Sequence, residues 1–180
     1  MRRRSLNVLL TLVLALLAAG CGDGDKGEAS CPPPGFGTDS RTTSTHGADV
    51  TFLTGVSAER TRCGDRVSFE FRDAAAGALV EYVPRERALV EDGSGRALEA
   101  EGGAFLVVRL TPAATAEANG DQIVPTYTGP RRLRPEDGRL VHEILKSGDF
   151  EAAVTWVIAL DEERPFRVAT SGRRLTVELA

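Results

Sequence analysis

Histidine and cysteine side chains are the groups in this chain that could act as bases, nucleophiles or metal ligands, and they are few. The sequence contains two histidines and three cysteines. His46 lies in a polar stretch, whereas His142 could serve as the general base of a small hydrolase. No nucleophile elbow accompanies it, because Gly93-Ser94-Gly95 lacks the G-x-S-x-G pattern. We therefore favour a surface position for His142 and predict no catalytic residue.

Cys21 is positioned for lipid attachment. It follows the small residues of Leu17-Ala18-Ala19-Gly20, after Arg2-Arg3-Arg4 and an apolar run over residues 8–19. This order is typical of a bacterial lipoprotein signal peptide, in which residues 1–20 are removed and the Cys21 thiol is acylated with diacylglycerol and palmitate. The acyl chains would hold the protein at the extracytoplasmic face of the cell membrane. An ordinary signal peptide followed by an incidental cysteine is the alternative.

Cys31 and Cys63 remain as a pair in a compartment where disulfides persist, so we expect a bond between them. Closing this loop would stabilise the fold by on the order of 3 kcal/mol. Two free thiols are the alternative, since spacing alone does not bring the sulfur atoms together. No cysteine or histidine pair has zinc-ligand spacing, and Asp23, Asp25 and Glu28 lack the other ligands of a calcium loop. We predict no metal and no cofactor.

The segment from Tyr127 to Pro135 is the most distinctive candidate binding loop, because it holds an aromatic residue and three arginines in nine residues of an otherwise acidic chain. A tyrosine can stack on a sugar ring, and arginines bind carboxylates bidentately. The candidate ligand-binding residues are Tyr127, Arg131 and Arg132, with Tyr82 as a weaker candidate. The pattern alone favours, by a small margin, the alternative that Tyr127 fills the core and the arginines pair with surface acids.

The charge balance disfavours nucleic acid as a partner. Loss of Arg2, Arg3 and Arg4 with the signal peptide takes the formal net charge from −4 to −7. Residues 21–47, rich in glycine, serine, threonine and proline, are expected to be the lipidated cysteine and a flexible tether. Residues 48–180 are expected to form one domain, because their length suits a single core.

Short alternating segments from Val50 onward predict an all-β domain. The expected strands lie at 52–56, 66–72, 80–82, 105–110, 152–160, 166–168 and 175–179. Trp156 shares a face with Val154, Ile158 and Leu160, which favours core burial over a sugar platform. Residues 139–146 fit a short helix or a strand equally well, and residues 111–126 are longer than most connections. The sequence predicts a single antiparallel β-sandwich of roughly eight strands with at most one short helix.

Four blocks occur in an order and spacing that resemble a known family: Gly64–Phe71, Tyr127–Pro130, Gly148–Leu160 and Pro165–Val168. Together they resemble the AMIN-like domain of actinobacterial lipoproteins across about residues 50–180. The resemblance implies an all-β sandwich similar to AMIN domains, which are non-catalytic modules that attach amidases and secretion proteins to the cell wall. It carries over no catalytic residue, and the Cys31 and Cys63 pair looks like an addition to the family pattern.

These observations lead to a hypothesis and two alternatives. The leading hypothesis is a membrane-anchored, non-enzymatic lipoprotein that binds a cell-envelope ligand, peptidoglycan or another wall glycan. The first alternative is an interaction module that docks an envelope protein through an exposed sheet edge. The second is a small hydrolase with His142 as its base.

Overall fold

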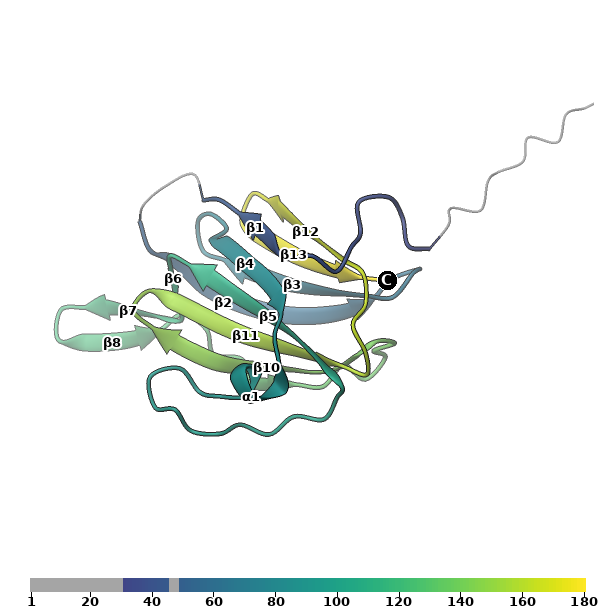
Figure 1. The fold of residues 1–180 in the computed structure, drawn as a ribbon. Coiled ribbons are helices and arrows are strands. Elements are labelled where there is room, and N and C mark those ends of the chain that lie inside the picture. The colour runs from purple at the N-terminus through teal and green to yellow at the C-terminus, as the bar shows by residue number, and fades with distance from the viewer. Residues whose placement is uncertain (1–30, 46–48) are drawn as a thin grey trace, which may run out of the picture.

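The computed structural model of the chain describes residues 31–45 and 49–180 (Figure 1). The predicted signal peptide, Cys21 and His46 lie outside these residues. The described part is almost entirely β-structure, with one short helix, α1 (Arg85–Ala88). This confirms an all-β fold with a single short helix.

Two large sheets contain most of the described strands. The six-stranded sheet has the spatial order β1 (Arg41–Thr43), β4 (Gly77–Tyr82), β5 (Ala104–Thr111), β11 (Ala153–Leu160), β10 (Val141–Phe150) and β9 (Arg132–Leu133). The five-stranded sheet has the order β12 (Phe166–Ser171), β13 (Arg174–Leu179), β3 (Asp65–Phe71), β2 (Thr51–Arg60) and β6 (Ala113–Ala114). A separate hairpin of β7 (Ala116–Asn119) and β8 (Gln122–Pro125) projects from one end of the molecule (Figure 1).

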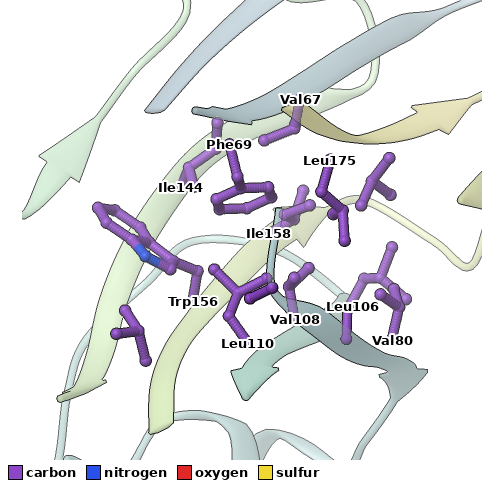
Figure 2. Packing of buried hydrophobic residues seen from close by; sticks show 14 of the residues in the cluster. Val67, Phe69, Val80, Leu106, Val108, Leu110, Ile144, Trp156, Ile158 and Leu175 are labelled. Atoms are coloured by element: carbon purple, nitrogen blue, oxygen red, sulfur yellow. The ribbon is translucent and has the colours of Figure 1, made fainter. Parts of the chain in front are cut away.

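The main hydrophobic core lies between the two sheets, where alternate residues of each strand point inward. Trp156 and Ile158 of β11 are fully buried against residues such as Phe69 of β3 and Leu175 of β13 (Figure 2). The ring centroids of Trp156 and Phe69 are 6.2 Å apart. The structure therefore confirms the expected core position of Trp156.

A second apolar layer covers the outer face of the six-stranded sheet. Residues 83–103, which include α1, run below β10 and β11 in Figure 1. Leu89 and Ala100 of this segment pack on Phe105, Leu145 and Val157 of the sheet. Because β11 is covered on both faces, every one of its residues is buried, which is the pattern of a central strand.

The architecture differs from the prediction in several respects. The described residues contain thirteen strands in three sheets, where a single sandwich of roughly eight was expected. The β2–β6 pair is parallel, so the pairing is not purely antiparallel. The one helix lies at Arg85–Ala88, whereas residues 141–146 belong to strand β10. Residues 111–126 hold β6 and the β7–β8 hairpin.

The β10–β11 hairpin closes through a two-residue turn. Phe150 pairs with Ala153, and the intervening Glu151 and Ala152 have φ values of 51° and 56°. Two consecutive positive φ angles match the twist of a right-handed hairpin, although Asn-Gly is the usual sequence there. The turn therefore carried no recognisable signal in the sequence.

The predicted disulfide is present. Cys31 and Cys63 are bonded, with their Cα atoms 5.5 Å apart. The chain between them contributes β1, which pairs with β4 at the edge of the six-stranded sheet, and Gly37 bridges to Phe166. Part of the segment expected to be a tether thus docks on the domain.

Candidate functional site

Tyr127 of the candidate loop is a core residue in this structure. Only 8 % of it is exposed, and its ring meets that of Trp156 edge-on at a centroid distance of 5.5 Å. The hydroxyl donates a hydrogen bond of 2.8 Å to the carbonyl oxygen of Pro130, and burial raises the pKa of the phenol. The ring is therefore not presented for stacking on a sugar.

The local sequence Tyr127-Thr128-Gly129-Pro130 explains how this tyrosine is held. The chain folds back so that the Tyr127 ring lies against Gly129. A Cβ atom at Gly129 would lie 2.7 Å from both Cζ and the hydroxyl oxygen of Tyr127, too close for carbon. Glycine is thus required by close approach, and the loop is anchored to the core before its arginines begin.

The hydroxyl of Tyr82 is also hydrogen-bonded within the domain, but at a different place. Its hydroxyl donates to the carbonyl oxygen of Arg164 and accepts from the Arg164 N–H, both at 2.8 Å. Burial raises its pKa to about 12. Four strand spacings separate β4 from β9, or roughly 19 Å at ~4.8 Å per strand. The structure does not bring Tyr82 together with the arginines of the loop.

Arg131 extends to the outer layer of the molecule. Its guanidinium lies 2.7 Å from a carboxylate oxygen of Glu91, which also accepts from Arg96 and from the Ser94 hydroxyl. Ser94, Arg131 and Arg96 together lower the pKa of Glu91 to about 2. Arg131 therefore belongs to an exposed ion-pair network.

Arg132 pairs with a buried carboxylate. It lies opposite Leu145 in the β9–β10 register, on the outer face of the sheet. Its Nη1 donates to Oε2 of Glu143, a side chain only 2 % exposed, and its Nη2 donates to the carbonyl oxygen of Glu99 at 2.7 Å. The Glu101 N–H supplies a further bond of 3.1 Å to Glu143 Oε1. Such partners offset the cost of taking a carboxylate out of water.

Arg132, Glu143 and residues 99–101 line an open cleft of about 450 Å³, and the buried Glu143 carboxylate forms its floor. Arg85 also lines the cleft, and it donates hydrogen bonds to the carbonyl oxygens of Ala100 and Gly102 at 2.9 and 3.3 Å. Its guanidinium also lies over the Phe105 ring, 5.2 Å from the centroid. The segment 99–102 is thus fixed between two arginines, and the cleft lies on the outer face of the six-stranded sheet.

The rim of the cleft carries charges of both signs. Arg134 is 67 % exposed in its side chain, and its one ion pair among the described residues is a 3.4 Å contact to Glu143. Glu99 and Glu101 are exposed, and their carboxylates form no ion pair within the described part of the chain. The cleft therefore offers a guanidinium and two carboxylates to a ligand.

His142, the candidate base, lies at the surface. Its Nε2 is 2.7 Å from a carboxylate oxygen of Asp161, and the two side chains are 43 % and 84 % exposed. Within the described residues its ring contacts no serine, threonine or cysteine hydroxyl or thiol by hydrogen bonding. The pair lacks the nucleophile that a histidine base would activate.

Across residues 31–45 and 49–180, no group of three histidine, cysteine, aspartate or glutamate side chains is arranged to hold a metal ion. No helix in the same ranges is long and apolar enough to span a membrane.

Two buried acids that hold the site in place, Glu143 and Asp65, were missed in the sequence. Glu143 stands among Val141, Ile144 and Leu145, and a carboxylate inside an apolar run was the available signal. Asp65 is 1 % exposed, and its carboxylate accepts hydrogen bonds of 2.7–3.0 Å from the N–H groups of Arg139, Leu140 and Val141. This ties the start of β3 to the start of β10, which carries Glu143.

The family model described as the AMIN-like domain matches residues 51–180, which span β2 to β13 and the whole cleft. No curated protein and no solved structure matches the chain.

Proposed function

Because the chain belongs to the AMIN-like domain family, we propose that it is a lipid-anchored, non-enzymatic lipoprotein whose domain binds a cell-envelope ligand, peptidoglycan or another wall glycan. AMIN-like domains are non-catalytic, extracytoplasmic modules associated with the cell wall. Cys21 is the proposed lipidated residue, and residues 21–30 are the proposed tether. The family match over the whole domain is the observation that carries this proposal.

The cleft around Glu143 is the proposed place of contact. Of the residues selected from the sequence, Arg132 lies in it and Arg131 is its neighbour in the chain. Tyr127 and Tyr82 are not proposed as contacts, because their hydroxyls are bonded within the domain. Arg134 replaces them, since its side chain is 67 % exposed, against 35 % for that of Arg132.

Co-sedimentation with purified cell-wall sacculi tests the proposal. The chain from residue 21, carrying Cys21→Ser to keep it soluble, should bind saturably and above the level of an unrelated acidic protein. Arg134→Ala should reduce binding, whereas Arg60→Ala, at the end of β2 in the other sheet, should not. Equal sedimentation of wild type and the unrelated protein would contradict a wall-binding function.

The proposed anchor has its own test. Metabolic labelling with a radioactive fatty acid should mark the full-length chain, and Cys21→Ala should abolish the label and release the protein from the membrane fraction. Labelling that persists in this variant would contradict acylation at Cys21.

A specific feature of β2 favours docking of an envelope protein as the second candidate. β6 pairs with β2 only at Thr51 and Phe52, and no described strand pairs with the remaining outer edge of β2, residues 54–60. Free backbone groups along such an edge can accept a strand from a partner. A photoreactive residue at Ser57 should then cross-link to one partner in cells, and the absence of any adduct would contradict this candidate.

A further inference from the structure

The cleft around Glu143 is suited to one part of a wall polymer more than to another. We propose that it binds a short wall peptide carrying both a carboxylate and an ammonium group, and not the sugar chain. This inference rests on the proposed wall-binding function and names the ligand class of the same site.

The composition of the cleft disfavours a sugar ligand. Sugar-binding sites commonly present an exposed aromatic face, against which a pyranose ring can pack. No tryptophan or tyrosine lines this cleft, since Trp156 and Tyr127 are core residues. Phe105, the nearby aromatic, is 2 % exposed and lies beneath the Arg85 guanidinium. The cleft therefore has no surface for stacking a sugar.

The charged side chains of the cleft favour a ligand that carries both signs of charge. The carboxylate on the floor, Glu143, is already matched by Arg132, Arg134 and the Glu101 N–H. Arg134 has further N–H donors that can bind a ligand carboxylate in a bidentate manner. Glu99 and Glu101 also line the cleft, and as exposed carboxylates they can accept hydrogen bonds from an ammonium group. Because the rim carries both a guanidinium and carboxylates, it is complementary to a ligand that carries both a carboxylate and an ammonium group.

The size and the rigidity of the cleft suit a short peptide. A volume of about 450 Å³ falls within the range of small-ligand sites, about 300–1,000 Å³. Segment 99–102 is clamped by Arg85 on one side and Arg132 on the other. The rim acids are thus held on a fixed backbone, which lowers the entropic cost of binding a short peptide.

Titration calorimetry with defined probes tests the inference. The probes are the alanyl-glutamyl-diaminopimelate tripeptide, the same peptide with its amines acetylated, the same peptide with its carboxylates amidated, and an uncharged N-acetylglucosamine tetramer. The protein is the chain from residue 21 with Cys21→Ser. The free tripeptide should bind, each blocked peptide should bind at least tenfold more weakly, and the sugar tetramer should give no saturable heat.

Variants locate the contact. Arg134→Ala and the double variant Glu99→Gln, Glu101→Gln should each weaken the tripeptide at least tenfold, and Arg134→Lys should retain part of the affinity. Arg60→Ala, the matched control, should leave it unchanged. These side chains are exposed, so the variants should fold, which circular dichroism checks.

The outcomes separate the two proposals. If the chain binds sacculi but the sugar tetramer binds and the tripeptide does not, or neither probe binds, the inference is overturned while the wall-binding function stands. If the tripeptide binds but Arg134→Ala has no effect, the site is overturned. If the chain fails to bind sacculi at all, the proposed function fails and the inference fails with it.

Discussion

Arg132 donates a hydrogen bond to Glu143, and this pair joins the edge strand β9 to the buried floor of the cleft. The Glu143 side chain is almost fully buried, whereas the Arg132 side chain is 35 % exposed. Arg132 therefore stabilises the fold, whether or not it also contacts a ligand. Its removal would disturb the domain as well as any ligand, and this is why Arg134 is the better probe of binding.

Removal of Arg132 should destabilise the domain more than neutralisation of its partner. Arg132→Ala leaves a buried carboxylate short of a cation and should cost about 3 kcal/mol. Glu143→Gln keeps an acceptor for the same donors and should cost about 1–2 kcal/mol. Urea unfolding measures both values. An Arg132→Ala variant as stable as wild type would contradict the pairing.

Asp65 should be among the most sensitive positions of the domain. Its carboxylate accepts from three consecutive N–H groups, those of Arg139, Leu140 and Val141. Asp65→Ala would leave them without a partner and should cost at least about 3 kcal/mol. Asp65→Asn, which keeps one acceptor oxygen, should cost less. Chemical denaturation ranks the two variants, and an equal loss for both would contradict the role of the acceptor oxygens.

The two tyrosines of the chain predict a specific alkaline behaviour. Burial raises the pKa of Tyr82 to about 12 and also raises that of Tyr127. Absorbance at 295 nm should therefore show both tyrosines ionising above their ordinary pKa of about 10 while the domain remains folded. A step near pH 10 with an unchanged circular dichroism spectrum would contradict the burial of one of them.

The raised pKa of Tyr82 determines the direction in which the free energy of unfolding changes with pH. Below about pH 10 Tyr82 is protonated in both the folded and the unfolded chain, so its contribution is fully present. Between pH 10 and about 12 the unfolded chain ionises first, and the free energy of unfolding should fall. The free energy of unfolding of the Tyr82→Phe variant, measured by urea titration, should fall less steeply across this range. Identical slopes would show that Tyr82 does not carry the effect.

Loss of the disulfide should lower stability without changing the fold. Cys31 and Cys63 are 32 residues apart in sequence, and opening a loop of this length costs about 3–4 kcal/mol in the chain-entropy model. The variant Cys31→Ser, Cys63→Ser should unfold at lower urea concentration, with a β-sheet circular dichroism spectrum like that of wild type. No change in the urea midpoint would contradict a structural role for the bond.

The strands that the sequence predicted well are those whose alternation is undisturbed. Val67, Phe69 and Phe71 of β3 point to the core as expected, and so does Trp156. Strand β10 was ambiguous because its register shifts between Val141 and Glu143 and between Lys146 and Gly148. Such bulges insert an extra residue and break the two-residue period. The pattern then fits a helix as well as a strand.

Short and polar elements left even less signal. The edge strand β1 is the polar sequence Arg41–Thr43, and α1 is only four residues long, so neither can display a period. The disulfide could be predicted because the signal peptide indicates a compartment in which disulfides persist, and because two cysteines remain once Cys21 is assigned to lipid. Of the four blocks that carried the family resemblance, two are now explained by the Asp65 bonds and by the packing of Tyr127 on Gly129.

The cleft could be predicted only in part. The arginine-rich loop drew attention to Arg132, but the residues that complete the site come from distant parts of the chain, such as Arg85, Glu99 and Glu143. Sequence spacing does not show which of these side chains meet. Tyr127 fills the core, which is the alternative that the sequence pattern favours by a small margin over a role in ligand binding.

The central claim is that wall material binds at the Glu143 cleft. The most direct measurement is the ¹H–¹⁵N NMR spectrum of the labelled chain during addition of soluble wall fragments. We expect the amides of Glu101, Arg132 and Arg134 to shift in a saturable way, while those of Ser57 and Thr176 on the other sheet do not. Shifts confined to the β2 edge, or no shifts at all, would contradict it.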